Sequence, residues 1–302
     1  MLVGMSNRRA ILGAASLAAI GVALALRKKT KMTEVEQPLP PCIFCNNESG
    51  SEEHLWPDWV HKFIKKNGID LQGLRVQEGT GPETIEYDVE KKINTVCHIC
   101  NNTWMSQIEQ KNRPRFLKML ENEPFTIDAG GMKVMTEWAV LKAMLLDSTK
   151  PRLGNENFYT REERVAFFEP HHPIPPRTRV WVGALDGFHI GGHGTDVTIT
   201  VDGGRTRIGT ACVNTIYQGY FVCQVVTEHF FPNITAEHIP PIQPPPGISD
   251  TKLIQMYPPP GKKADWPPPP FTNGGPNGIA HLMQRWRQGE KVLMIKKDRV
   301  VK

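Results

Sequence analysis

The sequence lacks three motifs that mark common nucleotide-binding and hydrolase sites. It contains no P-loop, no Gly-x-Ser-x-Gly and no Gly-x-Gly-x-x-Gly. It also lacks an excess of positive charge over most of its length. The formal net charge is +5, but residues 1–31 contain no acid and hold six of the 36 cations, namely Arg8, Arg9, Arg27, Lys28, Lys29 and Lys31. The remainder has 30 basic against 31 acidic residues, which excludes a uniformly basic nucleic-acid binder and confines any phosphate contact to a local cluster.

Residues 10–26 form a run without charge, flanked by cations on both sides. Its length is near the lower limit of about 17–25 residues for a membrane-spanning helix. The preceding Arg8-Arg9 pair is also similar to a twin-arginine export signal, and Met32 offers a later start. Three interpretations stay open: an anchor that gives an otherwise cytoplasmic protein membrane contact, an export signal, or an N-terminal extension.

Cysteine is scarce, with six residues in the chain, yet four of them form two Cys-x-x-Cys pairs. In a chain of this length the pattern favours a metal site over a disulfide framework. Four thiolates complete the tetrahedron that zinc prefers, and such a closed site is structural. We therefore expect one structural Zn²⁺ held by Cys42, Cys45, Cys97 and Cys100. Cys212 and Cys223 lie on apolar runs and are expected to be buried free thiols, or a hairpin disulfide if the protein is exported.

The residue patterns predict an α+β fold. After the hydrophobic segment 1–31, we expect a zinc-stapled domain over residues 38–122. It should contain a helix at 58–66, three short strands from about residue 74 to 97, and helices at about 101–111 and 114–120. An α+β domain should follow over 123–235, with a core helix at 136–146, a helix capped by Thr160 and Glu163, and antiparallel strands at 179–185, 196–201, 205–217 and 220–226. Residues 236–302 should form a Pro-rich strap and a helix at about 277–288.

Two short motifs accompany the cysteine pairs. Glu53-His54 begins "EHLWP", and "CHICNNTW" places Asn101 directly after Cys100. In order and type, these motifs resemble the HNH (ββα-metal) endonuclease family, in a zinc-stapled subset with an EHxxP and CxxCN pattern. The resemblance covers residues 42–120 and implies a small ββα-metal module. It also implies that His54 is a general base, that Glu53 and Asn101 bind a catalytic Mg²⁺ or another divalent ion, and that Asn94 orients His54.

The function implied by this resemblance is metal-dependent hydrolysis of a nucleic-acid phosphodiester, with DNA as the partner. Local cations that could contact phosphate occur in two clusters. They are Lys62, Lys65 and Lys66 in the first, and Lys111, Arg113, Arg115 and Lys118 in the second. The alternative is a non-catalytic zinc module that binds nucleic acid or a protein. The histidines of "HHPIPP" and "HIGGHG" lack an acidic partner at fixed spacing, so we expect them in loops.

Overall fold

The structure is a computed structural model, and it describes residues 39–69, 92–149, 157–201, 204–243 and 252–271. The chain divides into two compact units, 1–38 and 39–302, and all described residues belong to the second. The predictions for residues 1–31, for the strands before residue 92 and for a helix at 277–288 lie outside the described residues. Within the described part, no helix combines the length and apolar character needed to cross a bilayer.

The first part of the unit has two paired strands with a helix between them in the chain, followed by a longer helix. Strands β1 (Ser51–His54) and β2 (Lys92–Val96) pair antiparallel, with Ser51 opposite Val96 and His54 opposite Lys92. Helix α1 (Asp58–Lys66) follows β1 after a short turn, as predicted. After β2 the chain continues directly through α2 (His98–Cys100), the π-helical segment η1 (Asn101–Met105) and α3 (Ser106–Leu120).

This continuous helix corrects the prediction of two helices, one from Asn101 or Asn102 to about Lys111 and one from Pro114 to about Leu120. The helix starts at His98, because the Sγ atom of Cys97 accepts a hydrogen bond from the backbone N–H of Cys100 at 3.4 Å and caps it. It runs through Pro114 to Leu120. Pro removes a backbone hydrogen bond, and burial of Ile108, Phe116 and Met119 on one face offsets that loss.

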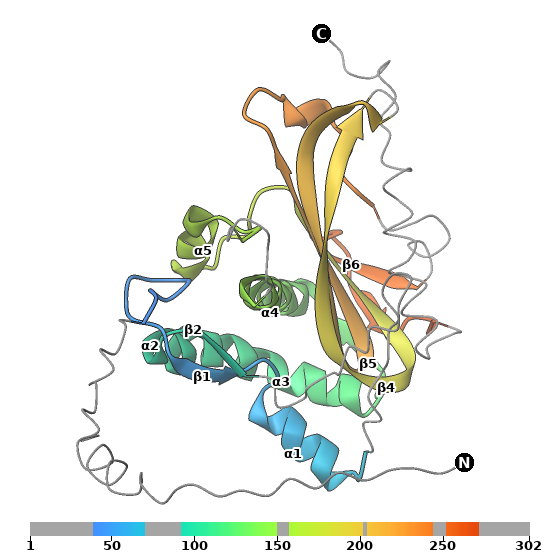
Figure 1. Cartoon of the computed structure of the whole chain (residues 1–302). Helices are drawn as coiled ribbons and strands as arrows, with labels where there is room; N and C mark the ends of the chain where they lie inside the picture. Colours follow the sequence, from blue (N-terminus) through green and yellow to red (C-terminus); the bar gives the residue numbers. More distant parts are fainter. Residues whose placement is uncertain (1–38, 70–91, 150–156, 202–203, 244–251, 272–302) are drawn as a thin grey trace, which may run out of the picture. The chain divides into compact units, whose positions relative to one another are not determined.

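Helix α4 (Ala129–Ser148) occupies the centre of the unit, where Figure 1 shows it end-on between α3 and the long strands. It contains the predicted core helix 136–146, and every residue from Met135 to Asp147 is buried. Helix α5 (Arg161–Phe168) begins with the predicted capping box, in which Thr160 Oγ1 accepts from the N–H of Glu163 and Glu163 accepts from the N–H of Thr160.

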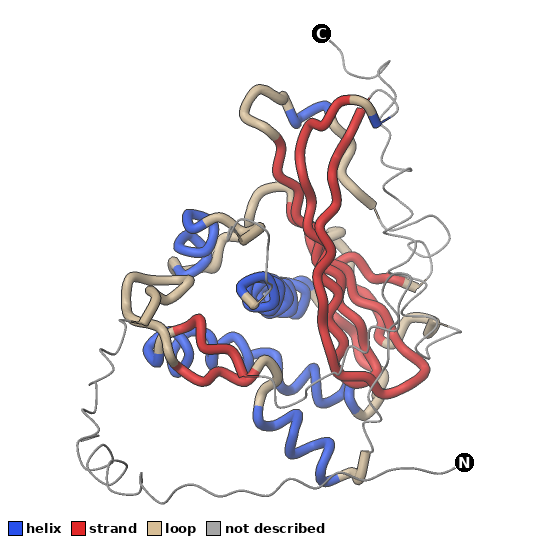
Figure 2. Tube along the Cα trace, viewed as in Figure 1, coloured by secondary structure: helices blue, strands red, loops and turns tan. Residues whose placement is uncertain are grey.

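The main sheet has the order β5-β4-β6, and Figure 2 shows its two long strands as a twisted red ribbon pair. Strands β4 (Thr178–Val201) and β5 (Thr206–Phe230) pair antiparallel over almost their whole length, and β6 (Leu253–Tyr257) pairs with β4. The four strands predicted between residues 179 and 226 are therefore parts of two long strands, β4 and β5. His189 and His193 lie on β4 and not in a loop, opposite Gly219 and Thr215.

Tertiary pairing explains this correction. The segment around His189 is rich in glycine and has little strand propensity of its own, but the β-branched and aromatic residues of β5 supply a complete partner. Gly192 has a packing role here, because a Cβ atom at this position would lie 2.9 Å from Leu146 Cδ1 on α4. Glycine therefore allows the sheet and the central helix to approach each other closely.

Part of the Pro-rich segment is an extended strap against the unit. Besides β6, it forms strand β7 (Ala264–Trp266), which pairs with β3 (Phe125–Ile127) and buries Trp266. One hydrophobic core includes residues from Cys42 to Trp266 and crosses the predicted domain boundary near residue 122. A second cluster on the sheet includes Trp181, Ile208 and Phe271. The α+β class is confirmed, whereas the division into separate domains stays a prediction.

Candidate functional site

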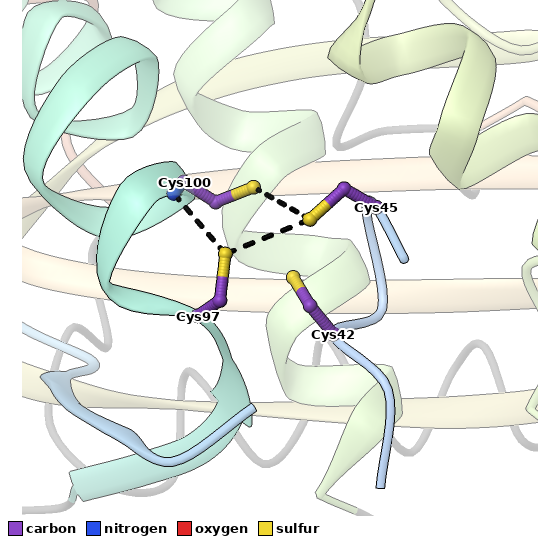
Figure 3. Close-up of side chains that lie close together, drawn as sticks. All are labelled: Cys42, Cys45, Cys97 and Cys100. Carbon is purple, nitrogen blue, oxygen red and sulfur yellow. Dashed lines mark hydrogen bonds between the residues drawn. The ribbon is translucent and has the colours of Figure 1, made fainter. Parts of the chain in front are cut away.

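The four paired cysteines converge on one point. Cys42 and Cys45 lie in the loop before β1, while Cys97 and Cys100 flank the start of α2. Their Sγ atoms all lie within 4.8 Å of one another, and Cys45 Sγ is 3.6 Å from both Cys97 Sγ and Cys100 Sγ. Figure 3 shows the four side chains pointing toward one another. Four sulfurs about 2.3 Å from a tetrahedral zinc lie roughly 3.8 Å apart, so this cluster could hold a metal ion and suits structural zinc.

The electrostatics of the cluster also suit a cation. A hydrogen bond from Cys100 lowers the pKa of Cys42, and the same contact raises the pKa of Cys100. Burial raises the pKa of Cys45. A metal ion bound here would replace the thiol protons of the cluster. Cys212 and Cys223 are buried free thiols on β5, as expected.

Arg161, which the sequence analysis did not single out, holds the loop of the first cysteine pair. Its guanidinium donates hydrogen bonds to the backbone carbonyls of Cys42 and Cys45 and to Asn46 Oδ1. Because Arg161 is the first residue of α5, these bonds attach the cysteine loop to a helix more than a hundred residues later in the chain. No local signal marks this contact, since the acceptors are backbone groups.

A solvent-accessible cavity of about 420 Å³ lies beside the cysteine cluster. We call it the Glu53 cavity. It is lined by the last residues of β1, the first turn of α1, the π-helical segment and α3. The charged and polar residues that matter here are Glu53, His54, Lys62, Asn101, Glu109 and Arg113. Three of the four predicted catalytic residues, Glu53, His54 and Asn101, therefore line one cavity.

Glu53 is a carboxyl group with little access to water, since its residue is 8% exposed. This burial raises its pKa to about 7, the proximity of Lys142 opposes the shift, and Glu109 adds to it. Lys142 is fully buried on α4, and its Nζ donates to Glu109 Oε1 at 2.7 Å. Sequence analysis missed Glu109 and Lys142. A lysine inside the apolar run 136–146 was the available signal, because a buried charge requires a partner.

His54 follows Glu53 on β1, whereas Asn101 comes from the π-helical segment. The His54 Nδ1 atom lies 3.7 Å from Asp58 Oδ1, one helical turn along the chain, and its side chain is 28% exposed. Asn101 lies in the π-helical segment, a rare turn found often at functional sites. Its Nδ2 donates to Ser51 Oγ on β1 at 2.8 Å, and a hydrogen bond from Asn101 also lowers the pKa of Glu53.

Asn94 is placed differently from the other three. It is exposed on β2, its backbone carbonyl accepts from the N–H of Gly50 at 3.1 Å, and it is not among the residues that line the Glu53 cavity. Its predicted role in orienting His54 stays a prediction, and Asp58 is the acid that the structure places beside that ring.

Comparisons of the chain with protein-family models, with curated proteins and with solved structures gave no match.

Proposed function

We propose that this protein is a metal-dependent endonuclease that hydrolyses a DNA phosphodiester in the Glu53 cavity. One observation carries the proposal: Glu53, His54 and Asn101 lie on two segments separated in sequence, yet they line a single open cavity beside the cysteine cluster. Strands β1 and β2 pair antiparallel, with α1 between them in the chain, and a longer helix starts at His98. This arrangement supports the proposal without identifying the family.

Glu53 and Asn101 would hold the divalent ion, because carboxylate and amide oxygens are the ligands that Mg²⁺ prefers. The buried carboxylate of Glu53 fits this role, since its charged form is destabilised by burial and a cation would relieve that cost. Asn101 would turn its amide so that Oδ1 faces the ion. When bound, the ion polarises the phosphate and stabilises the negative charge that develops on its oxygens.

His54 would act as the general base that takes the proton from the attacking water. A neutral imidazole nitrogen accepts a proton near physiological pH. Asp58 lies on the Nδ1 side of the ring at 3.7 Å. The resulting imidazolium would be stabilised by the Asp58 carboxylate, much as an acid supports a catalytic histidine elsewhere.

Two cations would bind the phosphate backbone on either side of the reacting group. Lys62 on α1 and Arg113 on α3 are exposed and both line the cavity. Contacts of this kind position a duplex and carry no information about base sequence. They therefore support a nuclease with little sequence preference and with salt-dependent binding.

The proposal is tested with the full chain, plasmid DNA and Mg²⁺, with EDTA added in a parallel reaction. His54→Ala should lower the cleavage rate roughly 10²–10⁴-fold, while zinc content stays constant and stability changes within about 0.5 kcal/mol. His238→Ala, at an exposed histidine outside the cavity, is the matched control and should cleave normally.

Cleavage that survives His54→Ala would overturn the assignment to this cavity. A wild-type protein that contains zinc and binds DNA, yet cuts neither DNA nor RNA with Mg²⁺ or Mn²⁺, would favour the alternative of a non-catalytic zinc module.

A further inference from the structure

A second cavity, of about 360 Å³, lies at the start of α4 and shares no lining residue with the Glu53 cavity. Its walls come from α4, from the loop after α5 and from the end of β6. The walls are mostly apolar and include Ile174, Met256, Tyr257 and Pro259. A cavity of this size with apolar walls is at the lower end of the range found for small-molecule sites.

Two polar side chains of α4 line this cavity next to each other. Thr136 is 1% exposed, and its Oγ1 atom has no hydrogen-bond partner among the described residues. A threonine inside a helix usually donates to the carbonyl one turn earlier, so an unpartnered hydroxyl at the cavity wall is a group that a ligand can satisfy. Leaving such a group buried without a partner costs free energy.

Glu137 is the second polar group, and it is 6% exposed. It forms an ion pair with Lys133, but the Lys133 Nζ to Glu137 Oε1 distance is 3.9 Å, too long for a hydrogen bond. Lys133 is also 65% exposed, so its ammonium is held mainly by water. The carboxylate is therefore mostly enclosed by protein, and its ion-pair partner Lys133 is an exposed lysine that does not hydrogen-bond to it, so a cation from solution could bind in its place.

His172, also in the lining, adds a further acceptor to the same cavity. Its Nδ1 lies 2.9 Å from the carbonyl oxygen of Phe167. Because a carbonyl can only accept, Nδ1 carries the hydrogen, and Nε2 of the neutral ring is an acceptor. Thr136, Glu137 and His172 thus give the cavity polar groups that accept hydrogen bonds, set among apolar walls.

We propose that this cavity binds a small organic cation, an ammonium group on an apolar or aromatic body. The ammonium would donate to the Glu137 carboxylate and to Thr136 Oγ1, and the body would contact Met256 and the ring of Tyr257. Acceptor groups and a buried negative charge favour a cation over an anion. A metal ion is a poorer occupant, because the four cysteines are the one metal-competent group among the described residues.

The test uses the full chain and three probes of similar shape: phenethylammonium, phenethyl alcohol and phenylpropionate. Binding is measured by calorimetry and by chemical-shift changes. We expect saturable binding of the ammonium in the millimolar range or tighter, with weaker binding of the alcohol and of the carboxylate. Glu137→Gln should weaken the ammonium about 10- to 100-fold, and Thr136→Val, which keeps the side-chain shape, about 2- to 10-fold.

Glu162→Gln, at an exposed glutamate of α5 that does not line the cavity, is the matched control and should bind like the wild type. Equal affinity for the ammonium and the alcohol in the wild type would overturn the proposal without any variant. So would tighter binding of the carboxylate, unchanged affinity in a folded Glu137→Gln protein, or no saturable binding of the ammonium at millimolar concentration.

Discussion

Glu53 lies at the end of a strand in a place that water reaches poorly, near the ion pair formed by Lys142 and a second carboxyl, Glu109. Its folded-state pKa of about 7 lies above the ordinary value of 4.5. The protonated form is therefore the one that the fold favours. The stability that Glu53 contributes is fully present below about pH 4.5 and is lost as the pH rises through 7.

Glu53→Gln should therefore stabilise the protein at high pH and change little at low pH. A glutamine cannot ionise, so the gain relative to wild type should grow between about pH 4.5 and pH 7 and reach about 3 kcal/mol above that range. The measurement is urea unfolding in Mg²⁺-free buffer at pH values on both sides of this range. If Glu53→Gln changed the free energy of unfolding equally at both pH values, the raised pKa of Glu53 would be refuted.

Glu52→Gln is the neighbouring control. Glu52 is exposed, and the hydrogen bond from Lys92 lowers its pKa. Its replacement should give no stabilisation that grows with pH.

At the scale of elements, the cysteine loop and α5 are joined through Arg161. The loop presents the carbonyl oxygens of Cys42 and Cys45, and one guanidinium binds both. Hydrogen bonds from a charged donor are stronger than neutral ones. Helix α5 therefore restrains the cysteine loop from outside the two Cys-x-x-Cys pairs.

Arg161→Ala should loosen the cysteine loop without removing a metal ligand. We expect a loss of about 1–3 kcal/mol in unfolding free energy and faster release of zinc to a chelator. Arg161→Lys should recover part of the loss, because a lysine can donate to one carbonyl but cannot span both. Arg205→Ala, in the exposed turn between β4 and β5, serves as the control. Zinc release at the wild-type rate in Arg161→Ala would show that the loop holds without α5.

At the scale of the whole unit, aromatic contacts connect the cysteine region to the sheet. Phe116 on α3 packs against Trp138 on α4 at 4.6 Å and against Phe221 on β5 at 5.1 Å between ring centroids. Phe221 in turn contacts Trp266 of the strap at 6.4 Å. The hairpin, the central helix, the sheet and the strap therefore share one core.

Removal of zinc should consequently destabilise the whole described unit and not the cysteine region alone. Cys97→Ser, or the wild type with a strong chelator, should lose the near-ultraviolet circular dichroism of the core tryptophans together with secondary structure in one transition. Cys212→Ser, at a buried cysteine outside the cluster, should retain zinc. A sheet that melts at the wild-type temperature after zinc loss would contradict the shared core.

Local patterns were sufficient for those features that depend on residues close in the chain. The two Cys-x-x-Cys pairs, the capping box of Thr160 and Glu163, and the apolar helix of residues 136–146 were all predicted. Each depends on spacing within one or two turns. Placing Glu53, His54 and Asn101 at one cavity required the family resemblance in addition, because the two segments are far apart in sequence.

Tertiary structure decided the contacts between segments that are distant in the sequence, and the physical reason is the same for each contact. Lys142 and Glu109 lie near Glu53, and Arg161 holds the cysteine loop. The glycine-rich segment around His189 became strand because β5 pairs with it. None of these contacts leaves a periodic signal in the sequence, since each joins side chains or backbone groups through packing of distant elements. The sequence by itself determined the pairing of the four cysteines and the main helices, whereas the packing around α4 decided which charges face the cavity.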